Sequence, residues 1–204
     1  MLRQSDGIFL DQDRLEDMMG HILEMVDRMV GIIQHLRVFS RDTSKEPDTQ
    51  FSLNEVVNES LKMIRAQLVN RGISVELELD ADLPNTVGNP RQLEQVCLHL
   101  LANARDALEQ EAERQDSDWH KRIVIRTQRG EEAILEVEDN GSGIEPEIQA
   151  RIFEPFFTTK EVDQGKGLGL SISYAIVQNH RGRIETTSRP GIETLFKVIL
   201  PISG

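Results

Sequence analysis

The chain has 204 residues, of which 38% are hydrophobic and 28% charged, as expected for one globular domain with a short appendage. Its net charge of −12 argues against a nonspecific nucleic-acid binder, because phosphate contacts need an excess of Lys and Arg. No apolar run reaches the ~18 residues of a membrane span, and no signal peptide is visible. A single cysteine fits a reducing compartment. These features predict a cytoplasmic chain without direct membrane insertion, although its parent protein could be membrane-anchored.

The first predicted element is a long amphipathic helix from about Leu10 to Arg41. Its apolar residues recur at spacings of three and four, as in Leu15, Met18, Met19, Ile22, Met25, Val26, Met29, Ile32, Ile33 and Leu36. A helix of this length needs a partner helix from its own chain or another to bury such a face. Ordinary core packing is one interpretation. We favour half of a dimeric bundle, because too little chain precedes the helix to supply a full-length partner.

The remaining elements follow a polar linker around Pro47. Helices are predicted from Ser52, with Glu55 completing a capping box, to about Asn70, from Pro90 to about Glu113, and from about Leu170 to Asn179. Strands are predicted over residues 73–79, 123–127, 133–138, 183–187 and 194–200. Helices and antiparallel strands segregate along the chain. The predicted class is therefore α+β, a two-layer α/β sandwich with one mixed sheet covered by helices on one face and preceded by the long helix.

A polar stripe follows the apolar face of the second of these helices. His99, Asn103 and Asp106 are separated by four and three residues, so they share one side of the helix. An amide oxygen on a rigid helix is a hard ligand that suits Mg²⁺. Taken alone, an Asn on a helix is more often a solvated residue.

Three further segments are unusual for core packing. The run Asp139-Asn140-Gly141-Ser142-Gly143-Ile144 follows a strand, where a carboxylate can accept a hydrogen bond from an adenine amino group, although D-N-G is also a common turn. The run Phe153–Lys160 reads F-E-P-F-F-T-T-K. The run Gly165–Ile172 reads G-K-G-L-G-L-S-I, and its glycines lead into a helix N-terminus that could face a polyphosphate. Neither a Walker A loop nor a dinucleotide fingerprint is present.

The order and spacing of these segments closely resemble the motif boxes of histidine kinase catalytic domains, within the Bergerat-fold ATPases. The resemblance covers roughly residues 50–202, and its F-E-P-F-F-T-T-K and G-K-G-L-G-L-S-I motifs are similar to those of the nitrogen-regulation-type subgroup. The segment Gln34–Arg41 likewise resembles the second helix of the dimerisation and phosphotransfer hairpin of these kinases. The expected domains are residues 1–46, part of that hairpin, and residues 47–204, the ATP-binding catalytic domain.

The resemblance implies a role for each matching residue. Asn103 would hold Mg²⁺ that bridges the phosphates, Asp139 would recognise the adenine amino group, and Thr194 would back the adenine. The ATP-binding set that it implies is Asn103, Asp106, Asp139, Gly141, Gly143, Ile144, Phe156, Thr159, Lys160, Lys166, Gly167, Leu168, Gly169, Leu170 and Thr194. The expected cofactors are ATP and Mg²⁺. The expected partners are a response regulator receiver domain and a second copy of the chain, bound through the N-terminal helix.

The sequence departs from the family pattern in three places. None of its histidines lies in an H-E-x-x-N/P motif, so the phosphoacceptor histidine is expected on sequence outside this chain, which would not autophosphorylate alone. His99 replaces an Asn that usually helps to hold the metal, and is interpreted as a tolerated or metal-supporting residue rather than a weak general base. Glu193 stands where a Gly usually precedes Thr194, and places a carboxylate near the adenine end.

The resulting prediction is ATP:protein-histidine phosphotransfer for relay to a response regulator. An ATP-hydrolysing relative would need a water-activating carboxylate at position 99. An anti-sigma-type serine kinase shares the motifs but does not need the long Met-rich helix. A non-catalytic ATP-sensing or dimerising module is the remaining alternative.

Overall fold

The computed structural model describes residues 18–20, 22, 25, 49–116, 118–159 and 167–202. Within the predicted N-terminal helix, the described residues 18–20, 22 and 25 are helical, and Met18, Met19, Ile22 and Met25 expose about half or more of their surface. The rest of that helix and its predicted dimer contact lie outside the described residues.

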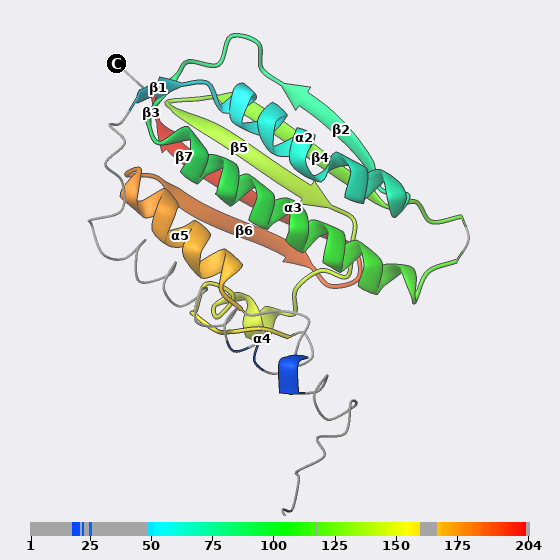
Figure 1. The fold of residues 1–204 in the computed structure, drawn as a ribbon. Coiled ribbons are helices and arrows are strands. Elements are labelled where there is room, and N and C mark those ends of the chain that lie inside the picture. Colours follow the sequence, from blue (N-terminus) through cyan, green and yellow to red (C-terminus); the bar gives the residue numbers. More distant parts are fainter. Residues whose placement is uncertain are drawn as a thin grey trace, which may run out of the picture.

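One five-stranded sheet organises the remainder of the described chain. Its strands are β2 (Ser74–Leu79), β4 (Arg122–Arg129), β5 (Glu132–Asp139), β6 (Arg183–Arg189) and β7 (Glu193–Pro201), in the order β2-β4-β5-β7-β6. Only β2 and β4 pair in parallel. The helices α2 (Leu53–Asn70), α3 (Pro90–Ala112) and α5 (Gly169–Asn179) lie over one face of this sheet (Figure 1). The predicted α+β class, a mixed sheet covered by helices on one face, is confirmed.

The core lies between the helices and the inner face of the sheet. Every second residue of β4 and β5 points inward, because side chains alternate along a strand. The fully buried members include Leu53, Leu68, Leu93, Leu100, Leu101, Leu108, Ile123, Ile125, Leu135, Ile176 and Leu200. No helix in the described ranges has the length and apolar character needed to cross a membrane.

Three details differ from the sequence prediction. The supposed linker ends in a short strand, β1 (Thr49–Phe51), which pairs with β3 (Thr86–Gly88), and a short helix, α4 (Pro146–Gln149), follows the first glycine-rich segment. Such short pieces are fixed by distant partners and leave no periodic pattern in the sequence.

The predicted capping box is the third difference. Ser52 is the N-cap residue of α2, but its side chain makes no capping hydrogen bond. The first turn is instead tied to the sheet: Asn54 Nδ2 donates to Asp80 O at 2.8 Å, and Thr127 Oγ1 donates to Asn54 Oδ1 at 2.7 Å. Tertiary hydrogen bonds therefore fix the start of this helix.

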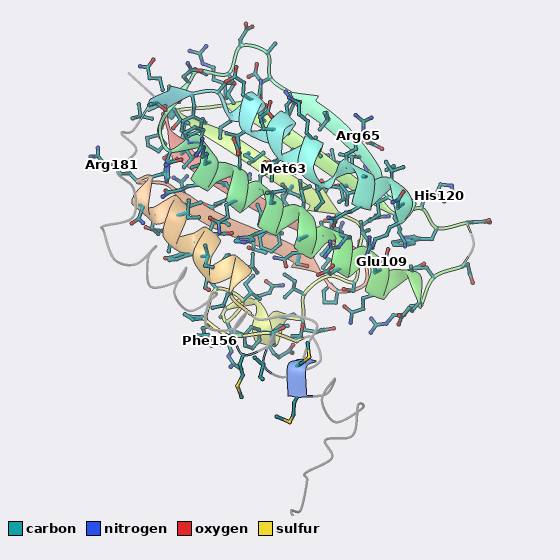
Figure 2. All side chains as sticks on the ribbon, in the orientation of Figure 1. Met63, Arg65, Glu109, His120, Phe156 and Arg181 are labelled. Atoms are coloured by element: carbon teal, nitrogen blue, oxygen red, sulfur yellow. The ribbon has the colours of Figure 1, made fainter. Side chains whose placement is uncertain are left out.

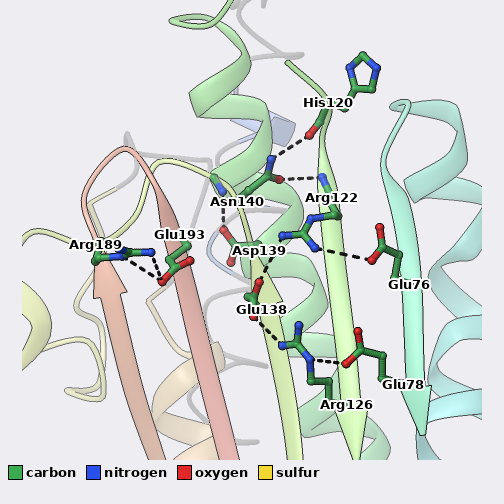
Figure 3. Close-up of polar contacts among 11 residues, drawn as sticks. Glu76, Glu78, His120, Arg122, Arg126, Glu138, Asp139, Asn140, Arg189 and Glu193 are labelled. Carbon is green, nitrogen blue, oxygen red and sulfur yellow. Dashed lines mark hydrogen bonds and ion pairs between the residues drawn. The ribbon is translucent and has the colours of Figure 1, made fainter. Parts of the chain in front are cut away.

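The outer face of the sheet is crossed by ion pairs (Figure 3). Arg126 contacts Glu78 on β2 at 2.7 Å and Glu138 on β5 at 2.6 Å, and Arg122 contacts Glu138 at 3.4 Å. Partly exposed pairs of this kind contribute little to stability individually. They do place cations among the acidic side chains of a strongly acidic chain, which reduces their mutual repulsion.

Candidate functional site

Helix α3 presents one half-buried polar stripe beside its buried apolar face. Asn89 caps the helix, since its Oδ1 accepts from Arg91 N at 3.0 Å, and Pro90 occupies the first turn. The inward face that includes Leu100 and Leu101 is completely buried, which fixes the rotation of the helix. His99 and Asn103 consequently lie one turn apart at the edge of the core.

Asp139 ends β5 with a buried carboxyl group. The residue is 3% exposed, and its Oδ1 accepts a hydrogen bond from the Gly141 amide at 2.9 Å. Burial raises the pKa of Asp139 to about 7, while the Gly141 hydrogen bond opposes part of that rise. A buried carboxylate with so little compensation is typical of a functional site.

The loop after Asp139 packs directly on α3. A Cβ atom at Gly141 would lie 2.7 Å from the backbone carbon of Ala107, so only glycine permits this approach. Ser142 N donates to Ala107 O at 3.1 Å. The glycine at position 141 therefore has a steric basis, and the loop after Asp139 meets α3 at Ala107, one helical turn beyond Asn103.

Thr194 lies opposite Asp139 in the pairing of β5 with β7. Its side chain is buried, and its Oγ1 is 3.0 Å from Ser188 Oγ on β6. The neighbouring Glu193 has the opposite orientation, since side chains alternate along a strand, and pairs with Arg189 at 2.9 Å (Figure 3). The predicted carboxylate near the adenine end is thus engaged in an ion pair of the hairpin, although its charge still contributes to the raised pKa of Asp139.

His99 lies next to Gly169, the first residue of α5. Ser173 Oγ donates to Gly169 O at 2.8 Å, so the 3.1 Å contact between Ser173 Oγ and His99 Nδ1 requires the imidazole to donate. This hydrogen bond network assigns the Nδ1–H tautomer, and Nε2 carries the lone pair. Burial lowers the pKa of His99, which keeps the ring neutral at pH 7. A Cβ at Gly169 would be 3.6 Å from the ring, so the two residues are in contact.

The F-E-P-F-F segment packs against Gly167. Phe156 N donates to Gly167 O at 2.9 Å, and a Cβ at Gly167, whose φ is 64°, would collide with Phe156 and Phe157 backbone atoms. Phe156 has a positive φ of 65°, an uncommon conformation for an aromatic residue, and its exposed side chain lies at the α4 end of the molecule (Figure 2). The predicted site residues Lys160 and Lys166, and Gly165 with them, lie outside the described residues.

Other predicted residues take less direct positions. Thr159 is exposed, Ile144 and Leu170 are partly buried, and Leu168 is buried in the core. The Asp106 carboxylate, predicted to contact ATP, lies 2.7 Å from Arg105 Nη2 in an ion pair on the surface of α3. Gly143, with a φ of 69°, packs against the backbone of Arg189 and Pro190.

Asn103 meets the condition expected of a group that awaits a ligand. Its Nδ2 atom is buried and has no hydrogen-bond partner, which is rare in folded proteins. Within the described ranges, no cluster of three or more His, Cys, Asp or Glu side chains could hold a metal ion. Mg²⁺ bound to a nucleotide needs few protein ligands, because phosphate oxygens and water complete its coordination. One side-chain amide oxygen, such as that of Asn103, fits that requirement.

Sequence reasoning missed the polar residues that support these groups. Ser188, Ser173 and Gln149 bond to the site residues from β6, α5 and α4. Each is a common residue in an ordinary helix or strand pattern, so only the folded topology identifies it.

Comparison with known proteins places this site in a family. Residues 88–204 match the model for histidine kinase-, DNA gyrase B- and HSP90-like ATPases. The chain is 33% identical over 203 residues to the signal transduction histidine-protein kinase AtoS of Escherichia coli, which covers 100% of this chain and 31% of AtoS. The first four curated relatives are spanned over only 20% to 51% of their length.

Solved structures agree with this assignment. The catalytic domain of histidine kinase ThkA superposes with a TM-score of 0.64 at 27% identity, covering 78% of this chain and 100% of that domain. Full-length ShkA superposes with a TM-score of 0.74 at 18% identity, covering 88% of this chain and 36% of ShkA, which supports the fold alone. The chain therefore belongs to the histidine kinase-, DNA gyrase B- and HSP90-like ATPase family, and its relatives within that family are sensor histidine kinases.

Proposed function

We propose that this chain binds ATP with Mg²⁺ and donates the γ-phosphoryl group to a protein histidine, as the catalytic domain of a two-component sensor kinase. The observation that carries the proposal is the alignment of three groups along α3. Gly169 contacts His99, Asn103 with its unpartnered Nδ2 follows one turn later, and the Asp139–Gly141 loop packs on Ala107. Eight helical residues span about 12 Å, which is comparable to an extended nucleotide.

The two ends of this row of groups along α3 match the two ends of ATP. Asp139 accepts a hydrogen bond from the adenine amino group, and Thr194 lies beside it. The Asn103 amide meets the phosphates or the Mg²⁺ that neutralises them, and the helix start at Gly169 offers backbone N–H groups to the polyphosphate. Phosphoryl transfer depends mainly on positioning and charge neutralisation, which these groups provide. AMPPNP in the ShkA structure is in keeping with this proposal.

His99 favours transfer over hydrolysis. An ATP-hydrolysing relative needs a carboxylate at this position to activate water. Here a neutral imidazole donates through Nδ1 to Ser173, and only its Nε2 lone pair is left to support the metal or its water. The site is therefore better suited to bind and position ATP than to hydrolyse it.

The rest of the reaction requires parts that the described residues do not include. The acceptor is a histidine in an H-E-x-x-N/P motif, which this sequence does not contain, and the phosphoryl group then passes to a response regulator receiver domain. The N-terminal helix pairs with that of a second copy. Residues 47–204 form the catalytic unit in this proposal, since the core extends from Phe51 to Leu200.

The test is phosphoryl transfer in trans. A separate protein that carries an H-E-x-x-N/P helix is incubated with γ-labelled ATP and Mg²⁺, with and without the chain. Acid-labile, base-stable label on the acceptor is the expected result. ATP binding without transfer would instead indicate a non-catalytic module, acid-stable label on serine would indicate a serine kinase, and phosphate release without an acceptor would indicate an ATPase.

A further inference from the structure

Ser188 on β6 is the centre of a hydrogen-bond network that joins the loop after β5 to the β6–β7 hairpin. Its Oγ accepts from Ile144 N at 2.9 Å, donates to Glu193 O at 2.8 Å and lies 3.0 Å from Thr194 Oγ1. Gln149 strengthens the same junction, because its Nε2 is 3.1 Å from Ile144 O and 3.3 Å from Ser188 O.

The direction of the bond between the two hydroxyls follows from the number of protons. A serine hydroxyl has one proton and two lone pairs. The Glu193 carbonyl can only accept, so it takes the Ser188 proton, and the Ile144 amide occupies one lone pair. Thr194 must then donate its own proton to the remaining lone pair. Thr194 Oγ1 is left as an acceptor towards any other partner.

This arrangement places two acceptors side by side. Asp139 lies opposite Thr194 in the sheet, and its ionised carboxylate can only accept. Adenine presents an amino donor at the edge where guanine presents a carbonyl acceptor. Two acceptors, the Thr194 hydroxyl and the ionised Asp139 carboxylate, stabilise the first base and repel the second.

We propose that Ser188 is a positioning residue that determines base specificity: it holds the Thr194 hydroxyl as an acceptor and so makes the site favour adenine over guanine nucleotides. This inference rests on the proposed ATP site at Asp139. Without Ser188, the Thr194 hydroxyl can rotate its proton towards a guanine carbonyl, and the discrimination falls.

The test compares nucleotide affinities rather than activity. Dissociation constants for ATP and GTP are measured by titration calorimetry, with Mg²⁺, for the wild-type chain, Ser188→Ala and the control Thr187→Ala. Thr187 is the preceding residue on the same strand and is exposed. The control substitution also removes a side-chain hydroxyl, but one outside this network. Ser188→Ala is expected to lower the preference for ATP over GTP by about tenfold, and Thr187→Ala by less than about twofold. A purely structural role would weaken both nucleotides equally, and an unchanged ratio in Ser188→Ala overturns the proposal.

Two further variants keep the test decisive. If Ser188→Ala does not fold, Ser188→Cys retains the shape with a weaker hydrogen bond, and the same fall in the ratio is expected. In a Thr194→Val background, Ser188→Ala should change the ratio of ATP to GTP affinity by less than about twofold, because the Thr194 hydroxyl through which Ser188 acts is gone. Additive effects would contradict the mechanism. A wild-type chain that binds neither nucleotide would refute the proposed function, and this inference with it.

Discussion

Asp139 faces Thr194 across adjacent strands; the residue is 3% exposed, and the Gly141 amide lies 2.9 Å from its Oδ1. The same burial that raises the pKa of Asp139 to about 7 makes the carboxylate a strong acceptor for a donor that enters the site. The ionised Asp139 thus destabilises the nucleotide-free fold and strengthens the binding of a hydrogen-bond donor.

The free energy of unfolding of the nucleotide-free chain should depend on pH because Asp139 is buried. The pKa of Asp139 is about 7 in the folded state against 3.8 for an aspartate exposed to water, so the folded state holds the proton more tightly. Stability contributed by this proton is present at low pH and lost as pH rises towards 7. Between about pH 5 and about pH 8, the free energy of unfolding of the wild type should fall by on the order of 3 kcal/mol relative to Asp139→Asn. Urea unfolding of both proteins measures it, and parallel pH profiles would contradict it.

Binding of the base should depend on pH in the opposite sense. Asp139 accepts from the adenine amino group only when ionised, so adenosine affinity should rise by about tenfold between about pH 6 and about pH 8. Adenosine is used because it has no phosphate group that titrates in this range. NMR titrations at several pH values provide the measurement. Asp139→Asn serves as the control, with weak and pH-independent binding.

Removal of the Asn103 amide should separate binding from stability. Because Asn103 Nδ2 has no partner in the fold, Asn103→Ala should leave the urea midpoint unchanged or raise it. Affinity for Mg-ATP should fall by about tenfold or more, while affinity for ATP in EDTA changes by less than about twofold. The exposed Asn58 on α2 supplies the control Asn58→Ala. Equal loss with and without Mg²⁺ would argue against a metal-linked role.

His99 should have a smaller effect. His99→Ala should weaken Mg-ATP binding by about two- to fivefold in calorimetry, because it removes a neutral supporting group and not a charge. His99→Asn, which restores the residue usual in related kinases, should bind at least as tightly as the wild type. An unchanged affinity in His99→Ala removes His99 from the site.

His180 should matter for stability and not for the site. Its Nε2 accepts from Asn89 N at 3.0 Å and its Nδ1 donates to Ile176 O at 2.8 Å, which joins the end of α5 to the start of α3. His180→Leu removes both of these buried hydrogen bonds and should lower the free energy of unfolding by about 2 kcal/mol. The exposed His120 gives the control His120→Leu, which should be within about 0.5 kcal/mol of the wild type in the same urea experiment.

Much of the fold could be predicted from local patterns. The helices α2, α3 and α5 and the five sheet strands begin and end close to the predicted residues, because periodicity, Pro90 and the glycine turns are local signals. The strands β1 and β3 could not be predicted in this way. Their three residue pairs join Thr49–Phe51 to Thr86–Gly88, and neither segment has a pattern of its own.

By itself, the sequence determined the class of fold and the family resemblance, and it supplied the prediction that Asn103, Asp139 and Thr194 bind the nucleotide. These follow from residue types at fixed spacing along the chain. Only the tertiary structure decided that Asp139 is buried opposite Thr194, that the Asn103 Nδ2 atom has no partner, and that Ser188 lies within hydrogen-bond distance of Thr194. Burial, desolvation and the direction of a hydrogen bond depend on neighbours that lie far apart in sequence.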